Sequence, residues 1–118
     1  MSYKFKFENA YEKRKDEADR VLLKYKDRVP VIVEADTNSE FDLTKNKFLV
    51  PKDISLSQMI YVIRKKINLA SEKALFLFID GTLPATSDLM SVLYEEKKSS
   101  DGFLYCLISA ESTFGFEK

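Results

Sequence analysis

Gly115 is the residue whose type and position suggest chemistry most clearly in this sequence. It lies near the end of the 118-residue chain, after the last apolar strand candidate, where no turn requires a glycine. A glycine in an extended tail can enter a narrow enzyme channel that a side chain would block. A cut between Gly115 and Phe116 would then expose a carboxylate for attachment to another molecule. Judged on the tail alone, an ordinary frayed terminus is the commoner case.

The residues that common catalytic and metal sites need are missing from the sequence. It contains no histidine, which excludes Ser-His-Asp and Cys-His catalysis and imidazole metal sites. Cys106 is the single cysteine, so a disulfide framework is excluded as well. Glu95 and Glu96 are adjacent on a predicted helix, where their side chains point in different directions and cannot flank one bond. We therefore expect no enzymatic activity, no metal and no cofactor.

Composition indicates one packed domain. A hydrophobic fraction of 45%, with nine phenylalanines and six tyrosines, is enough for a core in a chain of this length. Nineteen basic residues balance nineteen acidic ones, so net charge does not attract the chain to nucleic acid. No apolar run is long enough to span a bilayer, and the charged N-terminus does not suit a signal peptide. These features predict a soluble intracellular domain in a reducing compartment.

Periodicity and capping signals predict the order helix, strand, strand, helix, strand, helix, strand. The expected ranges are 9–25, 29–34, 47–51, 55–67, 74–79, 87–94 and 103–108. Asn9 with Glu12, and Ser55 with Gln58, are the predicted helix caps. Residues 12–16 should face water, and residues 3–7 suit either a helical turn or an extended segment.

The order of these elements favours an α+β fold. The continuous apolar run 74–79 is typical of a buried central strand, and Asp80-Gly81 predicts the turn that ends it. Two strands, a crossover helix and two further strands satisfy the β-grasp arrangement and its right-handed connection. We expect the N-terminal helix to cover sheet surface that the crossover helix leaves open.

The chain also resembles the autophagy ubiquitin-like modifiers of the GABARAP type. The matching segments, in order, are Glu12-Lys13-Arg14-Lys15, 25–34, Phe48-Leu49-Val50-Pro51, 63–67, Leu93-Tyr94-Glu95-Glu96, 101–105 and Thr113-Phe114-Gly115. Met59 stands where an aromatic residue is usual, so the resemblance is to a divergent member. It implies a ubiquitin-like β-grasp fold with two additional N-terminal helices. The implied parts are a helical extension over 1–25, a β-grasp domain over 26–110 and a tail over 111–118 with processing after Gly115.

The resemblance implies that the chain is a conjugated modifier. A cysteine protease would cut after Gly115, and activating and conjugating enzymes would pass the glycine carboxylate to the amine of phosphatidylethanolamine. The chain would be cytoplasmic, and on autophagosome membranes when lipidated, with the vacuole or lysosome as a further location. Two alternatives stay open: a soluble peptide-binding adaptor that is never conjugated, and a ubiquitin-like interaction domain with neither function.

The resemblance further implies binding of aromatic-x-x-aliphatic motifs of cargo receptors and adaptors along the predicted strand 47–51. The implied aromatic pocket consists of Glu17, Val21, Pro30, Lys47, Leu49 and Phe103. The implied aliphatic pocket consists of Phe48, Val50, Pro51, Ile54, Met59 and Val62. Acidic residues beside the motif would contact Arg28, Lys45 and Lys47.

Overall fold

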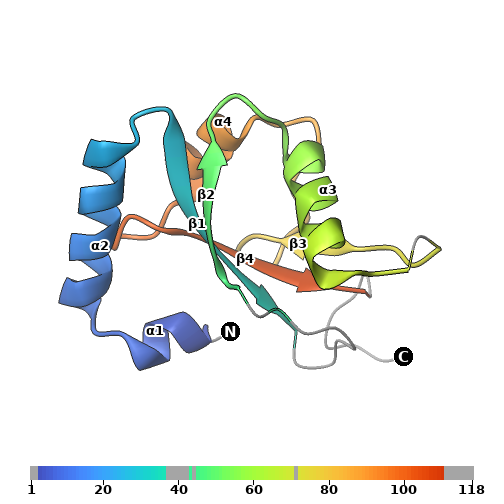
Figure 1. Cartoon of the computed structure of the whole chain (residues 1–118), viewed down its shortest axis with the longest axis horizontal. Coiled ribbons are helices and arrows are strands. Elements are labelled where there is room, and N and C mark those ends of the chain that lie inside the picture. The colour runs from blue at the N-terminus through green and yellow to red at the C-terminus, as the bar shows by residue number, and fades with distance from the viewer. Residues whose placement is uncertain (1–2, 37–42, 44, 71, 111–118) are drawn as a thin grey trace.

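Four strands form one mixed sheet in the computed structural model, which describes residues 3–36, 43, 45–70 and 72–110. The strands are β1 (Arg28–Ala35), β2 (Lys47–Pro51), β3 (Phe76–Phe78) and β4 (Leu104–Ser109), in the spatial order β2-β1-β4-β3. β1 and β4 are parallel, and the other neighbours are antiparallel (Figure 1). The helices are α1 (Lys4–Glu8), α2 (Tyr11–Lys24), α3 (Leu56–Ile67) and α4 (Met90–Lys97). Among the described residues, no helix is long and apolar enough to cross a membrane.

The larger core lies between the sheet and α3. Val29, Val31 and Val33 lie on one face of β1, as their alternation predicts, and belong to the same core as Met59 and Ile63 of α3. The predicted cap of α3 is confirmed: the Gln58 amide donates to Ser55 Oγ, and the Ser55 amide donates to Gln58 Oε1. Local sequence signals therefore fix both the start of α3 and the face that it buries.

The N-terminal helices cover the opposite face of the sheet. A second core joins Phe5 of α1 and Ala18 of α2 to Ile32, Phe103 and Tyr105. The rings of Phe5 and Phe103 meet edge to face with centroids 5.2 Å apart. Residues 4–8 are helical, which settles the alternative left open by their sequence. The expected fold, with α3 on one face and the N-terminal helices on the other, is confirmed.

The predicted cap of the long N-terminal helix is wrong. Ala10 occupies the position before α2 and makes no side-chain capping bond. Asn9 instead ends α1, where its side-chain amide donates to the Phe5 carbonyl oxygen at 3.0 Å. A second helix directly upstream therefore takes the hydrogen bond that Asn9 could have given to α2.

The prediction of a central strand over residues 74–79 is also wrong. β3 has three residues and lies at the edge of the sheet, where it pairs with β4 alone. Leu77 and Ile79 are nevertheless buried, because they belong to the core beneath α3. The turn at Asp80 and Gly81 is confirmed by their positive φ angles of 53° and 74°. The last helix begins at Met90, three residues later than expected.

Asp101 ties α2 to the sheet through a buried network. Its carboxylate accepts hydrogen bonds from Arg14 Nη1 at 2.6 Å, from the Tyr105 hydroxyl at 2.5 Å and from the Phe103 amide at 2.9 Å. Burial raises the pKa of Tyr105, and its hydrogen bond to Asp101 raises it further, so this hydroxyl remains a donor at neutral pH. The expectation that residues 12–16 all face water fails at Arg14, whose side chain is 12% exposed.

Gly102 lets α2 approach the loop before β4, so Gly102→Ala should destabilise the protein by about 2–4 kcal/mol. Gly102 has φ +95°, and an added Cβ would lie 2.8 Å from the Cβ of Ala18. Gly81→Ala is the matched control, because Gly81 also has positive φ but nothing lies within 4 Å of its added Cβ. It should cost about 1 kcal/mol. Equal losses in urea unfolding would contradict the close approach to α2.

Candidate functional site

β2 presents an open edge to solvent. In the antiparallel pair with β1, Phe48 lies opposite Val31 and Val50 lies opposite Val29. Two residues beyond Val31, the Val33 amide donates to the Asn46 carbonyl oxygen at 2.8 Å, so this pair is hydrogen-bonded. Because hydrogen-bonded and non-hydrogen-bonded pairs alternate, the backbone groups of Lys47 and Leu49 point away from β1. The edge can therefore accept one further strand.

Side chains of β2 alternate between the two faces of the sheet at this edge. Phe48 and Val50 are buried in the core beneath α3. Lys47 lies on the other face, where its ammonium forms an ion pair with Glu17 of α2. Leu49, two residues further along the strand, lies on the face of Lys47. The β2 residues Lys47 and Leu49, assigned to one implied pocket, therefore lie on the opposite face from Phe48 and Val50, assigned to the other.

The residues of the implied aromatic pocket meet between β2 and α2. The distance from Lys47 Nζ to Glu17 Oε2 is 2.8 Å, and the register places Leu49 opposite the buried Pro30. Val21 of α2 is half-buried. Phe103 is 2% exposed and belongs to the core beneath α2, so it can serve only as the floor of a pocket.

The implied aliphatic pocket lies on the α3 side and has a filled floor. Phe48, Val50 and Met59 are buried in one core, and Ile54 is partly buried against it. Val62 is 44% exposed, whereas Pro51 is half-buried and, by the alternation along β2, lies on the face of Lys47 and Leu49. Of these six side chains, Val62 is therefore the most accessible to a ligand.

The three predicted cations differ in their surroundings. Arg28 Nη1 donates to the outward carbonyl oxygen of Leu49 at 3.3 Å, and Lys45 Nζ lies 5.7 Å from the centroid of the Phe48 ring. Lys45 also borders a hollow of about 470 Å³ together with Lys65 and Lys66. No local sequence signal indicates that these two α3 lysines lie beside Lys45, because it depends on the end of α3 packing beside the start of β2.

The predicted cleavage site lies outside the described residues. β4 ends at Ser109, and Gly115 and Phe116 belong to the range 111–118, as does the whole predicted tail. The processing site therefore stays a prediction from sequence. Cys106, in contrast, is described, and it is a buried core thiol whose pKa is raised by burial.

A mixed sheet with parallel central strands, one helix across a face and short connecting elements defines the ubiquitin-like class of β-grasp proteins. Two helices before the sheet and an open β2 edge distinguish this example. The chain belongs to the Atg8 family, because the family model described as "Autophagy protein Atg8 ubiquitin like" matches residues 13–115. The resemblance found in the sequence is thereby confirmed.

Curated relatives match over nearly their whole length. Autophagy-related protein 8e of Arabidopsis thaliana is 54% identical over 112 residues, which cover 94% of this chain and 92% of that protein. Autophagy-related protein 8 of Mycosarcoma maydis is 54% identical over 116 residues, with 98% of each chain covered. The chain is thus a ubiquitin-like autophagy protein.

Two solved structures share the fold. The crystal structure of Trypanosoma brucei ATG8 matches with a TM-score of 0.91 and 38% identity, covering 98% of this chain and all of that one. Plasmodium falciparum Atg8, solved in complex with a Plasmodium falciparum Atg3 peptide, matches with a TM-score of 0.87 and 32% identity. That match covers 96% of this chain and 100% of the other.

Proposed function

We propose that this chain is an autophagy modifier that binds aromatic-x-x-aliphatic peptides along β2 and is joined to phosphatidylethanolamine through Gly115. The observation that carries the peptide-binding part is one open strand edge with apolar side chains on both of its faces. The Atg8 relative solved with an Atg3 peptide supports a peptide ligand of this kind, including one from the conjugating enzyme.

The geometry of the β2 edge accounts for the spacing of the motif. Successive side chains of an extended peptide point to opposite faces, so positions i and i+3 also lie on opposite faces. An aromatic residue at i would enter beside Leu49 and Val21 on the α2 side. An aliphatic residue at i+3 would then reach Val62 and the α3 side. A separation of two or four residues would place both anchors on one face and leave one pocket empty.

One hydrogen bond and one ion pair of cationic side chains must rearrange when a peptide binds. Arg28 bonds the outward Leu49 carbonyl that an incoming amide would need, and Lys47 bonds Glu17 at the aromatic pocket. Acidic residues beside the motif would offer both cations new partners. We therefore expect acidic neighbours to strengthen binding, with Arg28, Lys45 and Lys47 as their contacts.

In the conjugation step, the chain supplies an acyl group and docking surfaces, and other proteins supply the nucleophiles. A cysteine protease would remove residues 116–118, and activating and conjugating enzymes would carry the Gly115 carboxylate to the lipid amine. The chain itself has no enzymatic role in this scheme. It would be cytoplasmic before conjugation and lie on autophagosome membranes afterwards, with delivery to the vacuole or lysosome.

Peptide binding should depend on Leu49 and Lys45 in different ways. Leu49→Ala should weaken binding of a labelled acidic aromatic-x-x-aliphatic peptide by about 1–2 kcal/mol at every ionic strength, because it removes apolar contact. Lys45→Ala should weaken binding at low salt, with an effect that shrinks as salt rises, because its contribution is electrostatic. Titrations of both variants at low and high salt measure the two effects.

Leu83→Ala is the matched control for Leu49→Ala. Leu83 is half exposed and follows β3, at the edge of the sheet opposite β2, so its loss should leave peptide affinity unchanged. Unimpaired binding by Leu49→Ala, or the same salt dependence for Lys45→Ala and the original protein, would show that the peptide binds elsewhere.

A further inference from the structure

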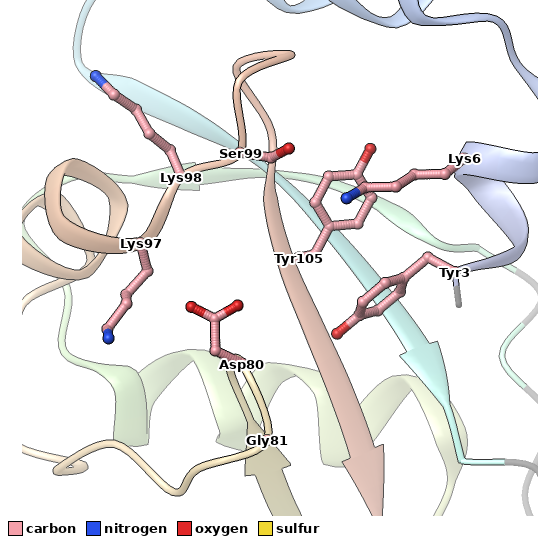
Figure 2. Close-up of a pocket in the computed structure, with 8 residues that line it drawn as sticks. All are labelled: Tyr3, Lys6, Asp80, Gly81, Lys97, Lys98, Ser99 and Tyr105. Atoms are coloured by element: carbon pink, nitrogen blue, oxygen red, sulfur yellow. The ribbon is translucent and has the colours of Figure 1, made fainter. Parts of the chain in front are cut away.

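A second recess lies away from the β2 edge, over the β4 side of the sheet. It has a volume of about 550 Å³, within the range of small-molecule sites. Its walls come from α1, the turn after β3 and the segment at the end of α4, and Tyr105 of β4 lies at its centre (Figure 2). Elements distant in sequence thus border one open cavity that peptide binding at β2 does not use.

Aromatic rings form one wall of this cavity. The Tyr3 and Tyr105 rings lie 5.0 Å apart between centroids, and Lys6 Nζ lies 4.4 Å from the centroid of the Tyr105 ring. Tyr105 is fixed in place because its hydroxyl donates to Asp101. Burial, and then nearby negative groups including Asp80, raise the pKa of Tyr3, so its hydroxyl remains protonated at neutral pH.

Charges of both signs face the cavity without neutralising each other. Within the described part of the chain, Asp80 and Lys97 take part in no ion pair, with each other or with another residue. Lys98 differs, because its ammonium pairs with Glu95 at 3.1 Å. In Figure 2 Lys97 extends to the side on which Asp80 lies, and Lys98 extends in the opposite direction. Lys97 is therefore the cation beside Asp80 that is available to a ligand, whereas Lys6 lies over the Tyr105 ring, on the other side of the cavity in Figure 2.

This combination selects against simple ions. Asp80 would repel a bare anion, and the lysines would repel a cation. A ligand that meets Lys97 and Asp80 together needs a phosphate for the ammonium and neutral hydroxyls that donate to the carboxylate. A saturated ring bearing those hydroxyls could also lie against the Tyr3 ring. We propose that this cavity binds a phosphorylated polyol ring of the inositol phosphate class.

The first test uses the full, uncut chain and myo-inositol 1-phosphate, followed by amide chemical shifts in NMR titrations. Shifts should centre on Gly81 and Ser99, which line the cavity. Lys97→Gln should weaken binding about tenfold, the scale of one charge-assisted hydrogen bond. Lys98→Gln, the adjacent change of equal charge, should alter affinity less than about twofold, because its ammonium already has a partner. Equal effects of the two variants, or shifts centred on β2, would overturn the proposal.

Asp80→Asn tests recognition of the hydroxyls and suits the positive φ of this position. The affinity for myo-inositol 1-phosphate relative to inorganic phosphate should fall about threefold, because a neutral amide accepts more weakly than a carboxylate. An unchanged ratio would overturn polyol recognition. Tighter binding of O-phosphoethanolamine than of the inositol phosphate would also overturn it, because Asp80 would then recognise an ammonium.

Vesicles distinguish a lipid source from a soluble one. Binding to vesicles with phosphatidylinositol 4-phosphate, beyond binding to phosphatidylserine vesicles of equal charge and lost in Lys97→Gln, would assign the site to a lipid head group. Specific binding of the soluble compound without vesicle binding would assign it to a free inositol phosphate. Absence of both would overturn the proposal, and none of these results depends on processing at Gly115.

Discussion

Asp101→Ala is expected to destabilise the protein by about 3–5 kcal/mol, a large part of the roughly 5–15 kcal/mol that holds a domain of this size folded. Asp101 is fully buried, and its loss would leave the Arg14 guanidinium, the Phe103 amide and the Tyr105 hydroxyl without their acceptor. Unpaired buried polar groups pay the full cost of leaving water. Chemical denaturation of the purified variant measures the loss.

Asp16→Ala supplies the matched control for this network. Asp16 pairs with Arg20 at 3.4 Å on the outer surface of α2, and both side chains are mostly exposed. Its removal should change stability by less than about 0.5 kcal/mol. If Asp101→Ala lost no more stability than Asp16→Ala, the buried network would not be what holds α2 against the sheet.

Gly115→Ala is expected to block maturation of the chain in cells, with a rate loss on the order of a hundredfold. Under the proposed function, the segment before the cut enters a narrow channel of the protease, and one added methyl group displaces the reacting carbonyl. Electrophoresis of the cellular protein would show the uncut, unlipidated form accumulating.

Phe116→Ala is the control for the same bond, because it changes the leaving segment and keeps the glycine. It should be processed normally if the channel constrains the acyl side of the cut. Normal lipidation of Gly115→Ala would contradict the requirement for glycine at this position.

Signals confined to a few neighbouring residues predicted their parts of the fold well. The bounds of β2 agree with the prediction, and the capping box at Ser55 and the three-valine face of β1 are confirmed. Each depends on spacing along one element or on a cap between residues three apart. The element order then left few ways to arrange a mixed sheet.

Interactions between distant residues could not be predicted in this way. Arg14 and Asp101 are 87 positions apart, and nothing near Arg14 distinguishes it from the exposed charges beside it. Asn9 could cap either of two helices, and only the presence of α1 decides between them. The apolar run before Asp80 looks central because α3 buries it, although it lies at a sheet edge.

In the candidate site, too, contacts between residues distant in sequence could not be predicted. Family resemblance implied the residues of both pockets, and the structure shows that Lys47 and Leu49 lie on the opposite face of β2 from Phe48 and Val50 and that Glu17 pairs with Lys47. The contribution of Lys65 and Lys66 beside Lys45 depends on how α3 packs, so no sequence pattern indicated it. The cleavage site at Gly115 lies outside the described residues and stays a prediction from sequence.

The mass of the intact mature protein, purified from its own cells, tests the central claim most directly. The modifier account predicts loss of residues 116–118 and, in the membrane fraction, an added phosphatidylethanolamine on Gly115. Fragmentation should place that adduct at the new C-terminal glycine. A mature chain that keeps Phe116, Glu117 and Lys118 and carries no lipid would contradict conjugation and favour a soluble peptide-binding adaptor with the same fold.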